Sequence, residues 1–315
     1  MQNNTCLRKS SASLFHPATR LLFGCATAVS LLLNVNQARA DEQLFGYVKG
    51  AETLPKGASE LYQWVTYRAN KGAGHYEAID WKTEFEYGVS DRFSASLALK
   101  ALSIDTSGLL IDGYVPGDKS SGFGFSGVEL AGKYNFLQPA KDPIGLAMYF
   151  SLDYGMLDPH SGQDKTTISA EMELLAQKYF MDGKLVWVGN VGYEATYAKR
   201  DEIANLPPGF DWPTEPEMEL ELKFGTGLSY RFARNWYFGA ETLYETEFET
   251  EVGQERWTWF AGPSLHYGGK RWWATLTYFH QLAGGGEKFA QQDNMSLHLI
   301  EKIKGEIRFK IGFNF

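Results

Sequence analysis

The feature of this sequence that most constrains its fold is an alternation of apolar and polar residues with a period of two. It is clearest between Glu217 and Phe232. The apolar set is Met218, Leu220, Leu222, Phe224, Leu228, Tyr230 and Phe232, and the polar set is Glu217, Glu219, Glu221, Lys223, Ser229 and Arg231. A helix would scatter both sets around its circumference, whereas a β-strand places them on opposite faces. The segment is therefore predicted to be a long amphipathic strand.

The same alternation recurs along the chain and predicts an all-β fold of about twelve strands. The predicted strands are 58–68, 76–88, 92–104, 124–137, 144–156, 166–180, 185–198, 217–232, 236–248, 255–267, 271–282 and 297–315. Short turns, such as the one at 181–183, alternate with longer connections, such as those at 199–216 and 283–296. Short periplasmic turns, longer outer loops and an even strand number are typical of a transmembrane antiparallel up-and-down β-barrel.

A soluble antiparallel sandwich would show the same alternation, because it too has one buried face and one wet face. Many of the predicted strands, however, are longer than the usual 5 to 6 residues and sufficient for a tilted membrane crossing of about 9 to 11. Aromatic residues also cluster where strands meet turns, as at Tyr134 and Phe136 and at Trp272 and Trp273. Such clusters are typical of the aromatic girdles of membrane barrels. After Asp41, no apolar stretch is long enough for a transmembrane helix, so the membrane barrel is favoured.

The first forty residues are predicted to be an export signal. Positive residues precede a mainly apolar run at 21–35, and Ala38-Arg39-Ala40 is a small-x-small cleavage motif. We therefore expect a signal peptide at 1–40, removed near Ala40, and a periplasmic N-terminal lead at 41–57. Residues 58–315 are predicted to form the barrel, located in the outer membrane of a Gram-negative cell.

The composition of the mature part excludes several functions. Both cysteines, Cys6 and Cys25, lie in the predicted signal, so disulfides and thiolate metal sites are not expected. Removing the signal leaves 26 basic against 38 acidic residues, and a basic footprint for nucleic acid is absent. The expected partners are instead outer-membrane lipids and lipopolysaccharide.

The C-terminus resembles the terminal strand of bacterial outer-membrane β-barrel proteins. Residues 306–314 alternate between apolar and mostly polar, and the chain ends on Phe315. In that family a final aromatic residue is the signal read by the barrel-assembly machinery. The resemblance thus implies Phe315 as the assembly signal and that machinery as a partner. The hairpin Glu86–Phe93 resembles the periplasmic hairpin of barrel transporters linked to the degradation of phenols and related compounds.

If the apolar face meets lipid, the polar face lines the lumen. Twelve strands spaced ~4.8 Å and tilted about 40° enclose a backbone diameter of roughly 24 Å, which side chains reduce to on the order of 10 Å. The residues assigned to the lumen are Asp80, Lys82, Glu84, Glu86, Glu129, Lys133, Asp153, Glu171, Glu173, Glu194, Glu219, Glu221, Lys223, Arg231, Glu241, Glu245, Arg308 and Lys310. Acidic residues dominate, and interior carboxylates stabilise a passing cation. A narrow cation-preferring channel or transporter for ions or small solutes is predicted.

Two alternatives remain open. Opposed charges in the lumen can pair and close the barrel, which would leave a structural or adhesion barrel without transport. An outer-membrane lipid hydrolase would resemble barrels that carry a strand-borne His-x-Ser, because an oriented imidazole must deprotonate the hydroxyl. The nearest segment, His160-Ser161, lacks the intervening residue and lies in a predicted loop. No catalytic residue is assigned, and the chain is not expected to be an enzyme.

Two further motifs have simple interpretations. Residues 122–127 match the G-x-G-x-x-G pattern of dinucleotide sites, but that pattern requires a preceding parallel strand and a following helix. Here an alternating segment follows, so glycines that ease barrel curvature are the interpretation we favour. Acidic loop residues offer ligands for Ca²⁺ or for cations that bridge lipopolysaccharide, although a solvated loop explains them more simply. They are Asp158, Asp164, Asp201, Glu202 and Glu215. Neither a cofactor nor a metal site is assigned.

Overall fold

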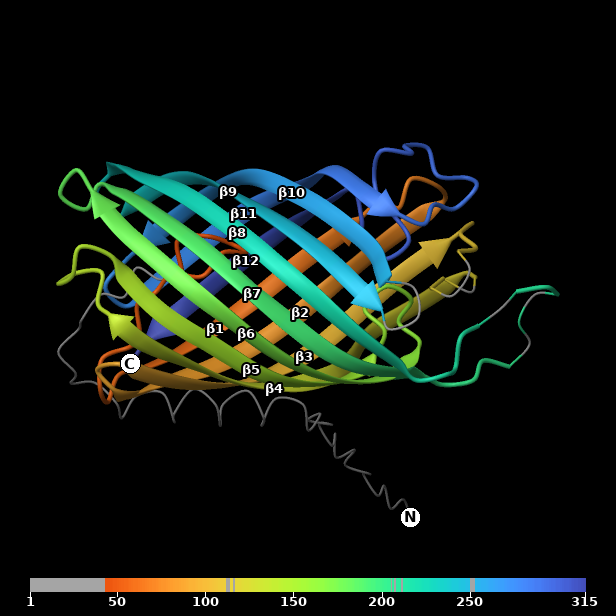
Figure 1. Cartoon of the computed structure of the whole chain (residues 1–315), viewed down its shortest axis with the longest axis horizontal. Helices are drawn as coiled ribbons and strands as arrows, with labels where there is room; N and C mark the ends of the chain where they lie inside the picture. Colours follow the sequence, from red (N-terminus) through yellow and green to blue (C-terminus); the bar gives the residue numbers. More distant parts are fainter. Residues whose placement is uncertain are drawn as a thin grey trace, which may run out of the picture. The chain divides into compact units, whose positions relative to one another are not determined.

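The computed structural model describes residues 43–315, except 112, 113, 116, 205, 207, 211 and 250–252. The predicted signal peptide at 1–40 lies outside the described residues. The described chain forms a closed antiparallel β-barrel of twelve strands (Figure 1). Each strand pairs with its neighbours in the sequence, and the first strand closes the barrel on the last. The predicted up-and-down barrel is therefore confirmed. Within the described residues, no helix is both long and apolar enough to cross a membrane.

The strands are 10 to 19 residues long. They are β1 (Ser59–Ala69), β2 (His75–Ser90), β3 (Phe93–Ser107), β4 (Lys119–Leu137), β5 (Gly145–Leu157), β6 (Asp164–Phe180), β7 (Leu185–Arg200), β8 (Glu217–Ala233), β9 (Trp236–Glu249), β10 (Gly253–Gly268), β11 (Trp272–Gly286) and β12 (Gly305–Asn314). The five short connections, from β2–β3 to β10–β11, lie together at the turn end, on the left in Figure 1. The longer connections lie at the opposite loop end.

Two predicted boundaries were wrong. Strand β4 begins at Lys119 rather than at 124, so the G-x-G-x-x-G segment lies within a strand. Strand β12 begins at Gly305 rather than at 297. The apolar residues that suggested an earlier start, Leu297, Leu299 and Ile303, are buried in a cluster inside the loop end. These residues are apolar because they are buried in that cluster, and their spacing in the sequence resembles the alternation of a strand.

The outer face of the barrel wall is apolar and its inner face is polar, as expected for a barrel in apolar surroundings. Large apolar side chains on the outer face are exposed, with Leu130 58% and Leu152 61% accessible. On the inner face, polar side chains such as Gln177 and Thr277 are wholly buried. Because successive side chains of a strand point to opposite faces, the period of two in the sequence generates this division directly.

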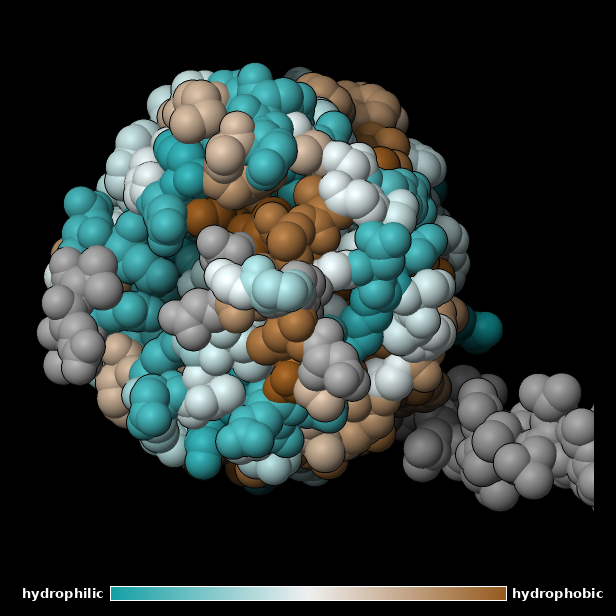
Figure 2. Space-filling model, turned by 90° about the vertical axis from the view of Figure 1, so that its right-hand side faces the viewer, coloured by the Kyte–Doolittle hydropathy of each residue, from teal (hydrophilic) through white to brown (hydrophobic). Residues whose placement is uncertain are grey.

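Apolar loop residues fill the middle of the loop end. Figure 2 views this end and shows apolar side chains near its centre, framed by hydrophilic ones. The cluster joins loop residues to the inner faces of β10 and β11, and it includes Leu109, Ile111, Phe260, Phe279, Phe289, Leu297, Leu299, Ile300 and Ile303. The long β11–β12 connection, residues 287–304, therefore packs its apolar side chains inside the barrel, whereas residues 293–296 are exposed.

Close approach of β10 and β11 predicts an effect of a single methyl group. A Cβ added at Gly262 would lie 1.7 Å from the carbonyl oxygen of Tyr278. We expect Gly262→Ala to destabilise the barrel by about 3 kcal/mol, the upper end for overpacked sites. Urea unfolding in lipid vesicles measures this. Gly122→Ala is the matched control, because a Cβ there meets nothing within 4 Å. Equal stability of the two variants would contradict the close approach.

Candidate functional site

Residues 43–54, called the lumenal segment from here on, lie inside the barrel towards its turn end. Inward-pointing side chains hydrogen-bond the backbone of this segment at successive points. In the order of the segment, they are Thr275, Lys310, Glu241, Asn190, Gln177, Asn135 and Ser94. These residues belong to β11, β12, β9, β7, β6, β4 and β3, so the segment follows the inner wall around most of the barrel. The sequence predicted a periplasmic lead here and gave no sign of this position.

Glu241 fixes the beginning of the lumenal segment. Its carboxylate accepts hydrogen bonds from the backbone N–H groups of Gly46, Tyr47 and Val48 at 2.7, 2.8 and 3.0 Å. The hydroxyl of Thr277 donates to the same carboxylate at 2.9 Å. Hydrogen bonds to an ionised acceptor are roughly twice as strong as neutral ones. One buried carboxylate thus satisfies three backbone donors of an irregular segment.

Two glycines of β8 make room for the apolar side chains of the segment. A Cβ at Gly227 would lie 2.8 Å from the ring of Phe45, and one at Gly225 would lie 2.7 Å from Val48. Phe45 and Val48 pack in a buried cluster with Val186 of β7. These two glycines therefore leave space for Phe45 and Val48 that a larger residue would occupy.

Charged side chains fill the lumen between the segment and the inserted loop. Lys49 of the lumenal segment lies 2.5 Å from Glu173 and 3.5 Å from Glu171. Lys302 of the β11–β12 loop lies 2.7 Å from Glu245 and 3.8 Å from Glu221. Both elements thus place an ammonium group on the acidic inner surface of β6, β8 and β9.

The strands add ion pairs of their own. Lys223 contacts Glu194 at 2.5 Å and Glu171 at 3.0 Å. On other strands, Lys82 of β2 contacts Glu129 of β4 at 2.7 Å, and Lys100 of β3 contacts Asp153 of β5 at 2.5 Å. Many of the lumenal carboxylates that the sequence identified are therefore neutralised by nearby cations.

Burial shifts the pKa of several groups outside the strands. Burial alone would lower the pKa of Lys49, but the carboxylates of Glu171 and Glu173 outweigh it and raise that pKa. Lys71, in the β1–β2 loop, donates to three carbonyl groups, one of them that of Ile300 at 2.6 Å. Burial, and then the charge of Arg68, lower its pKa to about 7. Lys49 is therefore held as a cation, whereas Lys71 is poised to lose its charge near neutral pH.

Most of the predicted lumen residues line three cavities inside the barrel. The first, of about 170 Å³ beside the lumenal segment, is lined among others by Lys82, Glu84, Glu86, Glu129, Lys133, Glu171, Arg308 and Lys310. The second, of about 420 Å³, is lined among others by Asp80, Lys82, Asp153, Glu194, Glu219, Glu221 and Arg308. The third, of about 340 Å³, is lined among others by Asp80, Glu171, Glu173, Lys223, Glu245 and Arg308.

Two predicted lumen residues line none of these three cavities. Glu241 is buried beneath the lumenal segment that it binds. Arg231 lies near the turn end of β8, where its side chain is half-buried. The inner side of the wall therefore includes positions that hold the segment as well as positions that border open space.

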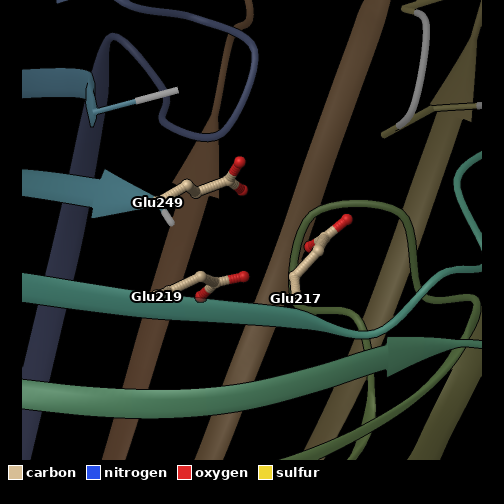
Figure 3. Close-up of side chains that lie close together, drawn as sticks. All are labelled: Glu217, Glu219 and Glu249. Atoms are coloured by element: carbon tan, nitrogen blue, oxygen red, sulfur yellow. The ribbon is translucent and has the colours of Figure 1, made fainter. Parts of the chain in front are cut away.

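A group of carboxylates lies at the loop end. Glu217 and Glu219 of β8 and Glu249 of β9 point to one region, and their oxygen atoms lie within 4.8 Å of one another (Figure 3). Arg200 pairs with Glu217, and Lys165 lies 3.6 Å from Glu219. The group is thus part of an ion-pair network, and we assign no metal to it.

The segment considered for lipid hydrolysis has a structural arrangement. Asp158, expected in a solvated loop, is fully buried, and its carboxylate accepts hydrogen bonds from the backbone N–H groups of His160 and Ser161 at 2.7 and 2.9 Å. Within the described residues, no hydrogen bond joins the His160 ring to the Ser161 hydroxyl. Burial holds the pKa of His160 well below its ordinary value. The His160 ring is therefore neutral and buried, and the hydrogen bonds of Asp158 hold the backbone of this loop in place.

Several residues that shape the lumen were missed by sequence reasoning. They are Tyr47, Lys49, Arg68, Arg256, Glu301 and Lys302, which line one or more of the cavities. Arg68 and Arg256 occupy inward positions in their strands, so strand parity was a signal available for them. The others lie in the lumenal segment and the inserted loop, where no periodicity indicates direction.

A family model matches most of the chain. Residues 37–315 match the family described as "Family of unknown function (DUF6662)". No curated protein matches the sequence.

Solved structures with this fold share little sequence with the chain. The crystal structure of the COG4313 outer membrane channel from Pseudomonas putida F1 is 12% identical, with a TM-score of 0.54, and the match covers 90% of this chain and 100% of that one. The NanC porin is 11% identical, with a TM-score of 0.46 and coverage of 80% and 98%. The translocator domain of the autotransporter NalP from Neisseria meningitidis is 13% identical, with a TM-score of 0.45 and coverage of 95% and 95%. The likeness to the first of these shows a shared fold.

The grip of Glu241 on the lumenal segment gives a testable prediction. Glu241→Gln removes the negative charge that receives three backbone N–H groups, and a hydrogen bond to a charged group contributes about 1.5–3 kcal/mol. We expect the amides of residues 46–48 to exchange with deuterium at least tenfold faster, as measured by mass spectrometry. Glu129→Gln is the control, because Glu129 contacts Lys82 instead. Unchanged protection in Glu241→Gln would show that other contacts suffice to hold the segment.

Proposed function

We propose that this chain, which belongs to the family of unknown function (DUF6662), is an outer-membrane channel for ions and small polar solutes. The observation that carries the proposal is the set of three cavities, each lined by several charged side chains, within a closed barrel that has an apolar outer face. Export of the chain by its signal peptide and assembly through Phe315 belong to the same proposal.

The outer face supports placement in a membrane. Exposed Leu, Ile, Val, Met and aromatic residues occupy it along every strand from β2 to β12. The strands are long enough to cross at a tilt, since about 9 to 11 residues suffice. Aromatic residues such as Trp236, Tyr267 and Trp272 gather near the turn end, and such girdles lie at the level of the lipid head groups. An apolar surface of this extent would aggregate in water.

Shared residues connect the cavities to one another. Trp64, Lys82 and Arg308 line both the first and the second cavity. Asp80, Glu301 and Arg308 line both the second and the third. A hydrated ion or small solute that entered one cavity would therefore meet the walls of the next. The proposed path runs beside the lumenal segment and then towards the loop end.

The charge of the cavity walls supports a weak preference for cations. Acidic side chains outnumber basic ones in the second and third cavities, although ion pairs neutralise many of them. In the first cavity basic side chains slightly outnumber acidic ones. Because carboxylate-lined passages stabilise cations, we propose that the two larger cavities favour cations. The first cavity weakens the cation preference of the whole path.

A closed barrel is the second candidate, and a specific observation favours it. The lumenal segment crosses the turn-end part of the lumen, and the apolar loop cluster fills the centre of the loop end. Both elements are anchored by hydrogen bonds or by buried apolar contacts. If neither moves, the lumen serves stability alone.

Conductance in planar bilayers separates the two candidates. For the mature chain, residues 41–315, we expect small unitary currents with a cation-selective reversal potential. Deleting residues 41–54 should increase the unitary conductance several-fold, because the segment fills much of the turn-end lumen. The control is a deletion of residues 208–210 in the β7–β8 loop, which line none of the three cavities. Silence of both the mature and the truncated chains would support the closed barrel, and an anion-selective reversal potential would contradict the charge argument.

A further inference from the structure

Arg308, on β12, lies where the three cavities meet and lines all of them. Its guanidinium carbon is 3.9 Å from the ring centroid of Tyr47 and 5.5 Å from that of Trp64. Tyr47 is in turn stacked on Phe279, with centroids 4.1 Å apart. Aromatic contacts of this kind attract the cation and restrict the orientation of its plane. The guanidinium is therefore held in place at the junction.

The hydrogen bonds of Arg308 leave part of its donor capacity unused. Its Nε donates to the hydroxyl of Thr66 at 2.9 Å, and one terminal nitrogen donates to the carbonyl of Gly46 at 3.2 Å. A guanidinium has five N–H donors, so three more are available to the cavities. Among the residues that the structure describes, no carboxylate lies within ion-pair distance of Arg308.

Glu306, two positions earlier on the same face of β12, interacts with Arg308 electrostatically but forms no direct ion pair with it. This lack of a direct ion pair distinguishes Arg308 from several other cations of the lumen. Lys82, Lys100 and Lys223 each contact a carboxylate directly. Lys49 and Lys302, brought in by the segment and the loop, do so as well. Removing an arginine from bulk water without a direct ion pair is costly. An anion that entered the junction would offset that cost, so the site is prepared for a negatively charged group.

We propose that Arg308 is the docking position for the carboxylate group of a small organic solute in the lumen. Carboxylates fit this role because their two oxygen atoms match the planar fork of a guanidinium. The acidic walls of the second and third cavities disfavour solutes with several negative charges. The solute class is therefore a small molecule with one carboxylate, which the same acidic walls would favour further if it also carried an ammonium group.

The proposal deepens the proposed channel, since it names a solute class for the same lumen, but binding can be measured without conduction. The probe is propionate, with uncharged propionamide as its isostere, and binding to the detergent-solubilised mature chain is followed by saturation-transfer NMR. We expect propionate to bind at least tenfold more tightly than propionamide. Arg308→Gln should abolish that preference. Arg308→Lys should retain part of it, because the charge remains while the fork is lost.

Lys56→Gln is the matched control, because it removes one positive charge from an exposed position outside the three cavities. It should bind propionate as the unmodified chain does, and the heat-shifted mobility of folded barrels in gels verifies that each variant folds. Equal binding of propionate and propionamide, an undiminished preference in Arg308→Gln, or equal competition by inorganic phosphate would overturn the carboxylate site. Binding without conductance would instead contradict only the channel, and conductance without binding only the site.

Discussion

Polar groups inside a closed barrel must find partners within the lumen, and this requirement governs the arrangement of the interior. The wall itself satisfies its backbone groups through strand pairing, but its inward side chains bring carboxylates, amides and hydroxyls into a confined space. Glu241, Asn190 and Gln177 meet this requirement by binding the backbone of the lumenal segment. The segment in turn lacks strand pairing of its own. Each therefore supplies the hydrogen-bond partners that the other needs.

The same requirement explains why acidic excess in the sequence overstated the negative charge of the lumen. Strand parity assigned the carboxylates of β6, β8 and β9 to the inward face. It did not reveal that Lys49 and Lys302 approach those carboxylates from non-strand segments. A count restricted to strands therefore omits the cations that reach the lumen from elsewhere in the chain. The selectivity of the path depends on the local balance at each cavity more than on the net charge of the protein.

The features that could be predicted from the sequence are those that the period of two determines. It located twelve strands and assigned inward and outward faces, because a strand such as β8 separates Met218 from Glu219 by geometry alone. It was wrong about where β12 begins, since burial of Leu297, Leu299 and Ile303 in a loop cluster imitates alternation. It also gave no sign of the lumenal segment, whose position depends on long-range contacts with seven different strands. Arg308 was assigned to the lumen by parity, but its lack of a direct ion pair is visible only in three dimensions.

The chemistry of the two inserted elements indicates which of them opens more readily. The lumenal segment is held by hydrogen bonds along its length and by the buried side chains of Leu44, Phe45 and Val48 near its start. Exchanging one of these hydrogen bonds for one to water costs about 0.5–1.5 kcal/mol, more where Glu241 is the acceptor. The β11–β12 loop is held largely by apolar side chains, whose exposure costs roughly 25 cal/mol per Å². Water entering the turn end can replace the hydrogen bonds of the segment, whereas it cannot replace the apolar contacts of Leu299 or Phe289. Solutes that reach the first cavity thus meet the element whose hydrogen bonds water can substitute, and Arg308 donates a hydrogen bond directly to its Gly46 carbonyl. An anion that drew the guanidinium away from that carbonyl would loosen the segment at the same point where Glu241 holds it.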